Sequence, residues 1–96
     1  MIEDGDNLKA EEVIAEVAKL STQFGATKII LYGSRAKGCA RERSDIDIAI
    51  SGVKDFDTLV EKVENLPTLY SVDLLDIDHC KNQLLLEDIR QYGRKI

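Results

Sequence analysis

The sequence has few of the residues from which several common kinds of functional site are built. Its 96 residues include two cysteines, one histidine, one proline and no tryptophan. Two cysteines are too few for a disulfide scaffold or for a zinc site with four ligands. The single histidine, His79, has no second imidazole with which to form an acid–base pair or a metal cluster. Any metal or catalytic site must therefore be sought among the carboxylates.

Long hydrophobic stretches are missing as well. No apolar run comes near the roughly 20 residues that a membrane-spanning helix needs, and the acidic amino-terminal segment shows no secretory signal. We therefore expect a cytoplasmic protein that does not bind membranes. The net charge of −5 disfavours general binding to nucleic acids. With 44% hydrophobic and 32% charged residues, the chain has the balance of a folded protein, and its length predicts one domain over residues 1–96.

The spacing of the apolar residues alternates between helical and strand periods. It predicts helices at about 7–24, 57–66 and 81–92 and strands at 27–32, 45–50 and 69–75. We therefore expect an α+β fold with a small three-stranded sheet that is covered by helices on one face. Asp55 or Asp57 is expected to cap the second helix, and Asp78 the last. The 11-residue link between the first two strands is compatible with either a hairpin-like or a crossover connection.

Asp45 and Asp47 are the most informative pair in the chain. They alternate with isoleucines at 46, 48 and 50, so a strand over 45–50 directs both carboxylates to one face and the isoleucines to the other. Two carboxylates on one face form a ligand pair for a hard divalent cation such as Mg²⁺. The alternative is a solvated strand face on which the charges deter aggregation.

The segment just before this pair is basic. Residues 35–43 carry four basic side chains against the single acidic Glu42, although the chain as a whole is acidic. Basic residues beside a carboxylate pair are suited to a nucleoside triphosphate, since they can hold phosphate oxygens. Gly33 allows close approach of the backbone, and Ser34 offers a hydroxyl and an amide. The alternative is an ordinary charged surface loop. The P-loop pattern fails, because Cys39 and Ala40 stand where lysine and serine or threonine are required.

Gly33-Ser34, ten residues and Asp45-Ile46-Asp47 resemble the G-S-x10-D-x-D signature of the DNA polymerase β-like nucleotidyltransferase superfamily. The longer string YGSRAKGCARERSDIDIAI is similar to the minimal nucleotidyltransferase (MNT) family, and the likeness extends over nearly the whole chain. The resemblance implies a mixed sheet with flanking helices. It also implies that three carboxylates hold two Mg²⁺ ions, the first two being Asp45 and Asp47, and that Gly33 and Ser34 bind nucleotide phosphate.

The third carboxylate should come from the third strand, which offers Asp73, Asp76 and Asp78. Asp73 lies within the apolar run, where a carboxylate is costly to bury unless a partner such as a metal compensates. Asp76 falls on the opposite strand face, and Asp78 is better placed as a helix cap. Asp73 is therefore the preferred third ligand, and Asp76 is the alternative.

The resemblance implies a Mg²⁺-dependent transfer of a nucleoside monophosphate, in particular AMP from ATP, to a hydroxyl. Asp45, Asp47 and Asp73 would be both the metal ligands and the catalytic residues. Basic side chains of the 35–43 segment would contact the phosphates, with Arg41 or Arg43 on the leaving pyrophosphate, but no single arginine can be assigned. The candidates are Arg35, Arg41 and Arg43.

The short chain leaves little room for a domain that holds the acceptor, so we expect a partner in trans. MNT-like proteins resemble antitoxins encoded beside a HEPN-domain protein, which implies a helical HEPN-type partner whose hydroxyl, for example that of a tyrosine, accepts AMP. Two alternatives are a binding module that neutralises its partner by complex formation alone, and a degenerate member that binds nucleotide without turnover. A homodimer and a hetero-oligomer are both compatible with the sequence.

Overall fold

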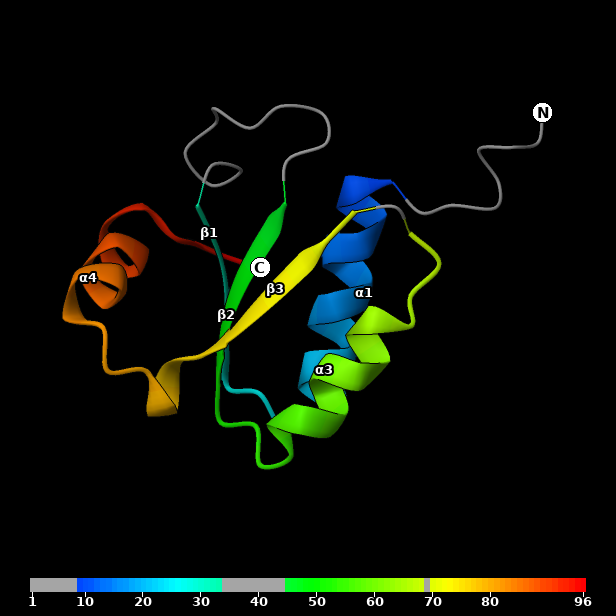
Figure 1. Ribbon diagram of the computed structural model, residues 1–96, viewed down its shortest axis with the longest axis horizontal. Coiled ribbons are helices and arrows are strands. Elements are labelled where there is room, and N and C mark those ends of the chain that lie inside the picture. The colour runs from blue at the N-terminus through cyan, green and yellow to red at the C-terminus, as the bar shows by residue number, and fades with distance from the viewer. Residues whose placement is uncertain (1–8, 34–44, 69) are drawn as a thin grey trace.

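The computed structural model describes residues 9–33, 45–68 and 70–96. Three α-helices, four strands and one short 3₁₀ helix make up this part of the chain (Figure 1). In chain order the elements are α1 (Ala10–Gln23), β1 (Lys28–Tyr32), β2 (Ile46–Ser51), α3 (Phe56–Glu64), β3 (Val72–Asp76), η2 (Ile77–His79), α4 (Gln83–Tyr92) and β4 (Arg94–Lys95). No helix among these described elements is long and apolar enough to cross a membrane.

The strands form one mixed sheet in the order β3-β2-β1-β4. β1 and β2 are antiparallel, so the connection between them is hairpin-like rather than a crossover. β2 and β3 are parallel and are joined by α3, as a parallel pair requires. The expectation of an α+β fold with a mixed sheet is thus confirmed, but the sheet has four strands rather than three. The additional strand, β4, is two residues long and pairs with β1.

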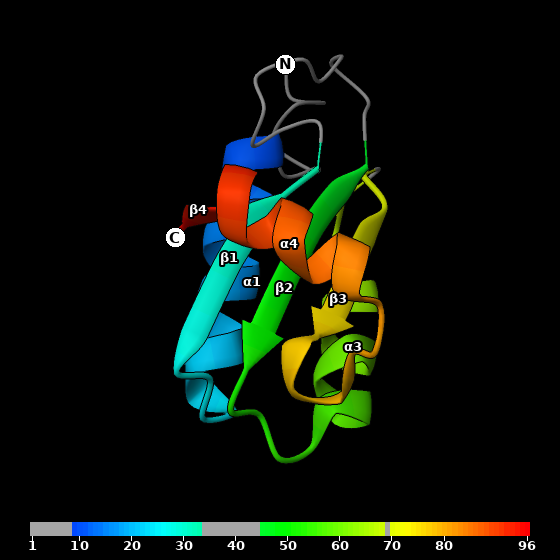
Figure 2. The same ribbon diagram turned by 90° about the vertical axis from the view of Figure 1, so that its left-hand side faces the viewer.

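Helices cover both faces of the sheet, so the expectation of cover on one face is wrong. α1 and α3 lie together on one face, and α4 lies on the other (Figures 1 and 2). The position of Gly93, which ends α4, supports this arrangement, because a Cβ added at Gly93 would meet the side chain of Ile30. On β1, Ile30 points away from the buried neighbours Ile29 and Leu31. The chain after α4 therefore runs over the face opposite to α1 and α3.

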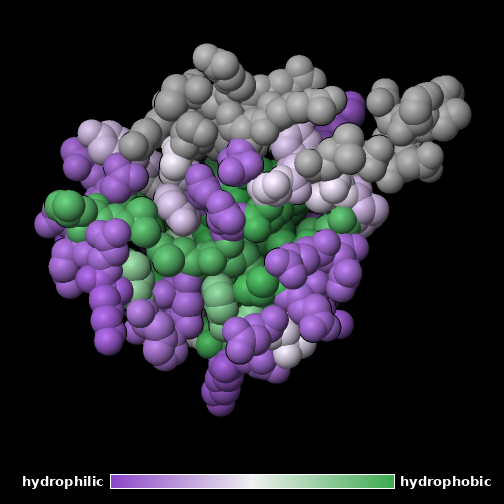
Figure 3. Space-filling model, viewed as in Figure 1, coloured by the Kyte–Doolittle hydropathy of each residue, from purple (hydrophilic) through white to green (hydrophobic). Residues whose placement is uncertain are grey.

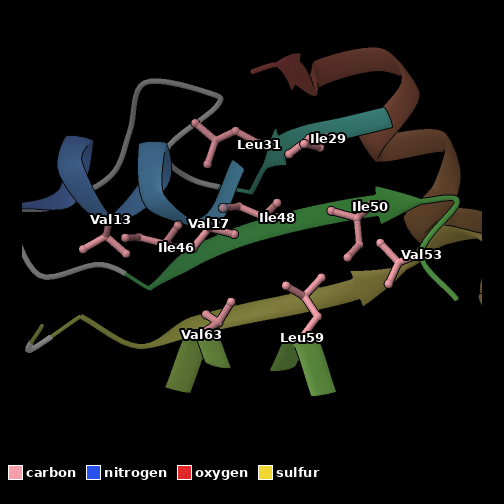
Figure 4. Close-up of a cluster of buried hydrophobic side chains, with 10 residues drawn as sticks. All are labelled: Val13, Val17, Ile29, Leu31, Ile46, Ile48, Ile50, Val53, Leu59 and Val63. Atoms are coloured by element: carbon pink, nitrogen blue, oxygen red, sulfur yellow. The ribbon is translucent and has the colours of Figure 1, made fainter. Parts of the chain in front are cut away.

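The main core lies between the sheet and the α1–α3 pair. The three isoleucines of β2 are completely buried there, as the strict alternation predicts, while Asp47 points to the face that α4 covers. Figure 4 shows the ten clustered side chains, which are Val13, Val17, Ile29, Leu31, Ile46, Ile48, Ile50, Val53, Leu59 and Val63. Each large side chain buried in this way contributes about 1.5–3 kcal/mol to folding. The core therefore fixes β2 firmly, with its one acidic residue, Asp47, directed away from it.

The helices begin close to the predicted positions, with one difference in capping. Asp55 caps α3 by accepting hydrogen bonds from the backbone N–H of Thr58 (3.3 Å) and from its hydroxyl (2.7 Å). Asn82 caps α4 by accepting from Leu85 N–H at 3.1 Å, so the expectation that Asp78 caps this helix is wrong. Asp78 instead accepts hydrogen bonds from Ser51, the last residue of β2, and from Gly52 after it, and the helix starts later, at Gln83.

β3 is an edge strand, with β2 on one side of it and no strand described on the other. Its apolar residues are only partly buried. In Figure 3 a hydrophobic region occupies the middle of this view, where Figure 1 places β3 between α4 and α3, and hydrophilic side chains flank it on both sides. Residues on this strand are therefore accessible from the edge of the sheet.

Candidate active site

The strand register brings Tyr32, Asp47 and Asp73 into one row across the sheet. Tyr32 on β1 pairs with Asp47 on β2, and Asp47 pairs with Asp73 on β3. Directly paired residues on adjacent strands direct their side chains to the same face, and in an antiparallel pair such as Tyr32 and Asp47 the Cβ atoms are about 4.5–5.5 Å apart. The row therefore lies on the face opposite to the isoleucine core, at the end of the sheet where β1 finishes and β2 and β3 begin (Figure 1).

The carboxylates at this end of the sheet repel each other. The pKa of Asp47 is raised above its ordinary value, first by partial burial and then by the negative charges of Asp73 and Asp45, and a hydrogen bond with Asp73 acts in the same direction. Burial, the negative charges of Asp47 and Asp73, and a smaller contribution from Cys80 raise the pKa of Tyr32 to about 12. The phenol therefore keeps its proton at neutral pH, and the site as a whole favours a positive ligand.

Gly33 is required here for two reasons. Its φ is 76°, a left-handed conformation that glycine adopts at little cost. In addition, a Cβ at this position would collide with Oδ2 of Asp47. The sequence predicts that this glycine lets the backbone approach a phosphate, and the structure shows that it also makes room for the carboxylate of Asp47.

The predicted phosphate-binding residues fall mostly outside the described part of the chain. Ser34, Arg35, Arg41 and Arg43 all lie there, so their roles stay predictions. Asp45 is described, exposed and placed just before β2.

The two candidates for the third carboxylate differ in their surroundings. Asp73 lies beside Asp47 and is exposed, so the argument that it must be compensated because it is buried is wrong. It is exposed because β3 is an edge strand. Asp76 already has partners, since it accepts hydrogen bonds from Asp78 N–H at 3.1 Å and lies 2.7 Å from His79 Nδ1. Geometry therefore favours Asp73 over Asp76 as a companion of Asp47.

The donor chemistry of the row fits Mg²⁺. This ion is usually held by one or two carboxylates together with substrate phosphates, and Asp47 and Asp73 supply two carboxylates. Within residues 9–33, 45–68 and 70–96, no group of three or more Asp, Glu, His or Cys side chains is close enough to hold a metal. Asp45 acts on Asp47 through its charge without completing such a group. The described residues thus form a two-carboxylate site with a third acidic residue at its border.

Sequence reasoning missed the position of Tyr32. Tyr32 is not among the candidate site residues of the sequence analysis, and the structure places it half-buried beside two carboxylates. The alternation of side chains along the strand could have revealed this position. Ile29 and Leu31 point into the core, so Ile30 and Tyr32 point to the opposite face, which also carries Asp47.

Comparison with known proteins identifies the family. The family model described as "Polymerase beta, Nucleotidyltransferase" matches residues 12–96. The chain belongs to this family. The chain is therefore a nucleotidyltransferase domain, and Asp47 and Asp73 lie within the matched region.

One relative and two solved structures illustrate the likeness. Over 45 residues the chain is 49% identical to "Putative protein adenylyltransferase MJ0604" of Methanocaldococcus jannaschii, and the match covers 47% of this chain and 45% of the relative. A solved structure described as "Structure of putative minimal nucleotidyltransferase" is similar with a TM-score of 0.65 and 25% identity, over 93% of this chain and 95% of that one. A toxin-antitoxin crystal structure with AMP-PNP has a TM-score of 0.65 and 23% identity, over 85% and 70% of the two chains.

Proposed function

We propose that this domain transfers a nucleoside monophosphate, in the simplest case AMP from ATP, to a hydroxyl acceptor, and that it needs Mg²⁺ to do so. The observation that carries the proposal is the row of side chains in which Asp47 and Asp73 lie side by side next to Gly33. The name of the adenylyltransferase relative and the AMP-PNP complex of a structural neighbour support ATP as the donor.

Asp45, Asp47 and Asp73 are the residues that would hold Mg²⁺, with two ions as the family resemblance implies. When bound, the metal neutralises the phosphates and stabilises charge that develops in the transition state. The mutual repulsion of these carboxylates supports this role, because the fold keeps Asp47 and Asp73 in register at a cost that a cation relieves.

The chain's own residues would position the two reactants. Ser34 and the basic side chains of residues 35–43 would bind the triphosphate beside Gly33. Asp73 would accept a hydrogen bond from the acceptor hydroxyl on the other side of Asp47. In the transfer, a bond forms between the acceptor oxygen and the α-phosphorus, the α–β phosphoanhydride bond breaks, pyrophosphate leaves and the hydroxyl proton passes to solvent. Much of the rate comes from holding these groups in line.

For the acceptor, we propose a hydroxyl on a second protein, a helical partner of the HEPN type, with a tyrosine as the simplest case. The toxin-antitoxin neighbour supports an antitoxin-like role, and we propose that this role is carried out in the cytoplasm. Transfer of AMP would add a bulky anion to the partner and could inhibit it by charge and by steric blocking.

Intact-mass spectrometry of the co-purifying partner tests this function. The partner is incubated with this protein, ATP and Mg²⁺, with the Asp47→Asn variant as the control. We expect the mass to rise by whole AMP units with the unaltered chain only. An unchanged mass with the complex still intact would contradict the transfer reaction and leave a binding module that neutralises its partner by complex formation.

A further inference from the structure

Tyr32 is a polar side chain on the face of the candidate site, and the proposed reaction does not yet use it. It is the last residue of β1 and pairs with Asp47 on β2, which in turn pairs with Asp73 on β3. The Tyr32 side chain is only partly buried. Within the part of the chain that the structure describes, its hydroxyl makes no hydrogen bond to another residue. A hydroxyl donor therefore stands on this face without a described protein acceptor.

The hydroxyl of Tyr32 stands farther from the sheet than the carboxylates do. Side chains of a strand stand roughly perpendicular to the sheet, and a tyrosine side chain is much longer than that of an aspartate. The charges of Asp47, Asp73 and Cys80 all act on the phenol. Asp73 lies on β3 and Cys80 follows η2, so both lie beyond β2 as seen from β1. The phenol therefore leans over Asp47, toward the middle of the sheet.

Helix α4 does not cover this end of the sheet. In Figure 2, α4 crosses the middle of the face, and the last part of β1 and the first part of β2 extend beyond it. A nucleotide bound at Asp47 must lie on the outer side of that carboxylate, because the strand lies on the inner side. The Tyr32 hydroxyl stands at this outer level.

The chain also places this tyrosine next to the predicted phosphate site. Gly33 follows Tyr32 directly and leaves β1 with a φ of 76°, and a Cβ on Gly33 would collide with the carboxylate of Asp47. Tyr32 and Gly33 therefore border Asp47 on the β1 side, whereas Asp73 borders it on the β3 side. The hydroxyl and the predicted phosphate site lie on the same side of Asp47.

We infer that Tyr32 is a further nucleotide-binding residue, whose hydroxyl donates a hydrogen bond to a non-bridging phosphate oxygen on the β1 side of Asp47. This inference rests on the proposed function and adds a contact residue to it. A phenol is protonated and uncharged at neutral pH. Tyr32 therefore offers a donor to an anion without adding negative charge to a row that already holds two carboxylates.

Two other roles for the phenol fit the structure less well. Donation to the carboxylate of Asp47 would need no nucleotide, but the hydrogen bond that Asp47 makes within the row is with Asp73 and not with Tyr32. Stacking of the ring on the nucleobase would bring the base to the end of β1, where Gly33 begins the predicted phosphate site. Phosphate is therefore the ligand group that the position of Tyr32 favours.

Calorimetric titration of the full chain with Mg-ATP tests this contact without depending on catalysis. Tyr32→Phe removes the hydroxyl and keeps the ring, so a role in stacking would survive the change. Tyr70→Phe, the same change in a tyrosine that packs against the main core, is the matched control. We expect Tyr32→Phe to weaken binding about tenfold, as for one hydrogen bond to a charged group, and Tyr70→Phe to bind normally. Equal affinities of Tyr32→Phe and the unaltered chain would overturn the inference.

The NMR signal of the phenol gives a second readout, which does not need the Tyr32 variant. The chain has three tyrosines, so in protein labelled with ¹³Cζ-tyrosine the spectra of Tyr70→Phe and Tyr92→Phe identify the Tyr32 signal by elimination. We expect Mg-ATP to shift this signal more than Mg²⁺ alone or Mg²⁺ with adenosine does. An equal shift with Mg²⁺ alone would mean that the hydroxyl acts on the carboxylates, and an equal shift with adenosine that it contacts the nucleoside. Either result would overturn the inference.

Binding and transfer data together distinguish the two proposals. Binding of Mg-ATP that depends on the Tyr32 hydroxyl, without transfer of AMP to the co-purifying partner, would contradict the proposed function and support the assignment of Tyr32. Transfer of AMP by Tyr32→Phe with the same Mg-ATP affinity and kcat/KM as the unaltered chain would support the proposed function and overturn the assignment.

Discussion

The two ends of the sheet use the same residue type in opposite ways. At the end where β2 and β3 begin, Asp47 and Asp73 lie beside each other, and the pKa of Asp47 is raised. At the other end, Asp78 accepts a hydrogen bond from Ser51 Oγ at 2.6 Å and another from Gly52 N–H at 2.8 Å. These bonds, with a smaller contribution from His79, lower the pKa of Asp78.

The contrast separates a structural carboxylate from one that is available to a ligand. Asp78 ties the turn after β3 to the end of β2, and its charge is stabilised by the donors around it. The charge of Asp47 is opposed by its neighbours, so an external cation would stabilise it. Substitutions at the two ends should therefore affect different properties of the protein.

The largest expected effect is that of Asp47→Asn on catalysis and nucleotide binding. Without this carboxylate the phosphates lose the metal-holding group in the centre of the row, so we expect kcat/KM for transfer to fall by about 100-fold or more. Calorimetric titration with Mg-ATP should show loss of binding, whereas Asp78→Asn, the same substitution at the other end of the sheet, should bind normally. Unchanged affinity in Asp47→Asn would show that the carboxylate pair is not the metal site.

The next effect separates binding from transfer on β3. Asp73→Ala should abolish AMP transfer but keep much of the affinity for ATP, because only the acceptor side of the site depends on it. Asp76→Ala should keep activity and lose stability, since Asp76 holds the 3₁₀ turn through Asp78 N–H and His79. Transfer assays and urea unfolding of both variants test these two expectations. An inactive Asp76→Ala with an active Asp73→Ala would reverse the assignment.

Asp78→Asn should lower stability. The variant loses the charge that attracts the Ser51 hydroxyl and the Gly52 amide, so the turn is held to β2 more weakly. We expect a lower midpoint of urea unfolding than in the unaltered chain. A matching decrease in Asp47→Asn would contradict the contrast between the two ends, because removal of a repelled carboxylate should leave the fold unchanged or more stable.

Acid should affect the two ends in opposite directions when no divalent cation is present. The pKa of Asp78 is lowered by folding, so its contribution to stability is complete above about pH 4 and is lost as the pH falls through its folded pKa. The pKa of Asp47 is raised by folding, so its ionised form destabilises the fold at about pH 7. That penalty disappears as the pH falls through the raised pKa.

The midpoints of urea unfolding, measured over a pH series, test both expected changes in stability. The advantage of Asp47→Asn over the unaltered chain should shrink as the pH falls toward about 4, and the deficit of Asp78→Asn should shrink only below that pH. Parallel curves for both variants would show that neither carboxylate has a pKa that folding changes.

The smallest effect concerns Ser21, which belongs to neither end. Its side chain is completely buried at the end of α1, and its hydroxyl has no hydrogen-bond partner among the described residues. Ser21→Ala removes an unsatisfied polar group and improves helix propensity, so we expect the free energy of unfolding to rise by about 0.5–1 kcal/mol. Thr22→Ala, next to it and exposed, is the control. A loss of stability in Ser21→Ala would mean that the hydroxyl is satisfied.

Much of the fold could be predicted because its signals are local. The strict alternation from Asp45 to Ile50 predicted the faces of β2, and Asp55 marked the start of α3 by its residue type. The face of the sheet that α4 covers could not be predicted, since an amphipathic pattern shows which side of a helix is buried but not what buries it. β4 was missed because two residues are too few to show a period.

For the candidate site, too, some features could be predicted from the sequence and others could not. The spacing from Gly33 to Asp47 indicated a nucleotidyltransferase, and the matching family model confirms that class. The preference for Asp73 over Asp76 rested on an expected burial that is absent, while the structure supports it through the register with β2. Register between distant strands is a tertiary property. The contact between Gly33 and Asp47 is tertiary as well, so no local pattern could reveal it.

The parallel register of β2 and β3 limits how this chain can change in length. Successive residues of a strand point to opposite faces. One residue inserted between Tyr70 and Asp73 would therefore turn the carboxylate away from Asp47 and toward the isoleucine face. Two residues would restore the face but move the carboxylate about 6–7 Å along the strand. Among homologues, insertions and deletions in this connection should therefore be rare, and loop-length variation should concentrate where no carboxylate depends on the register.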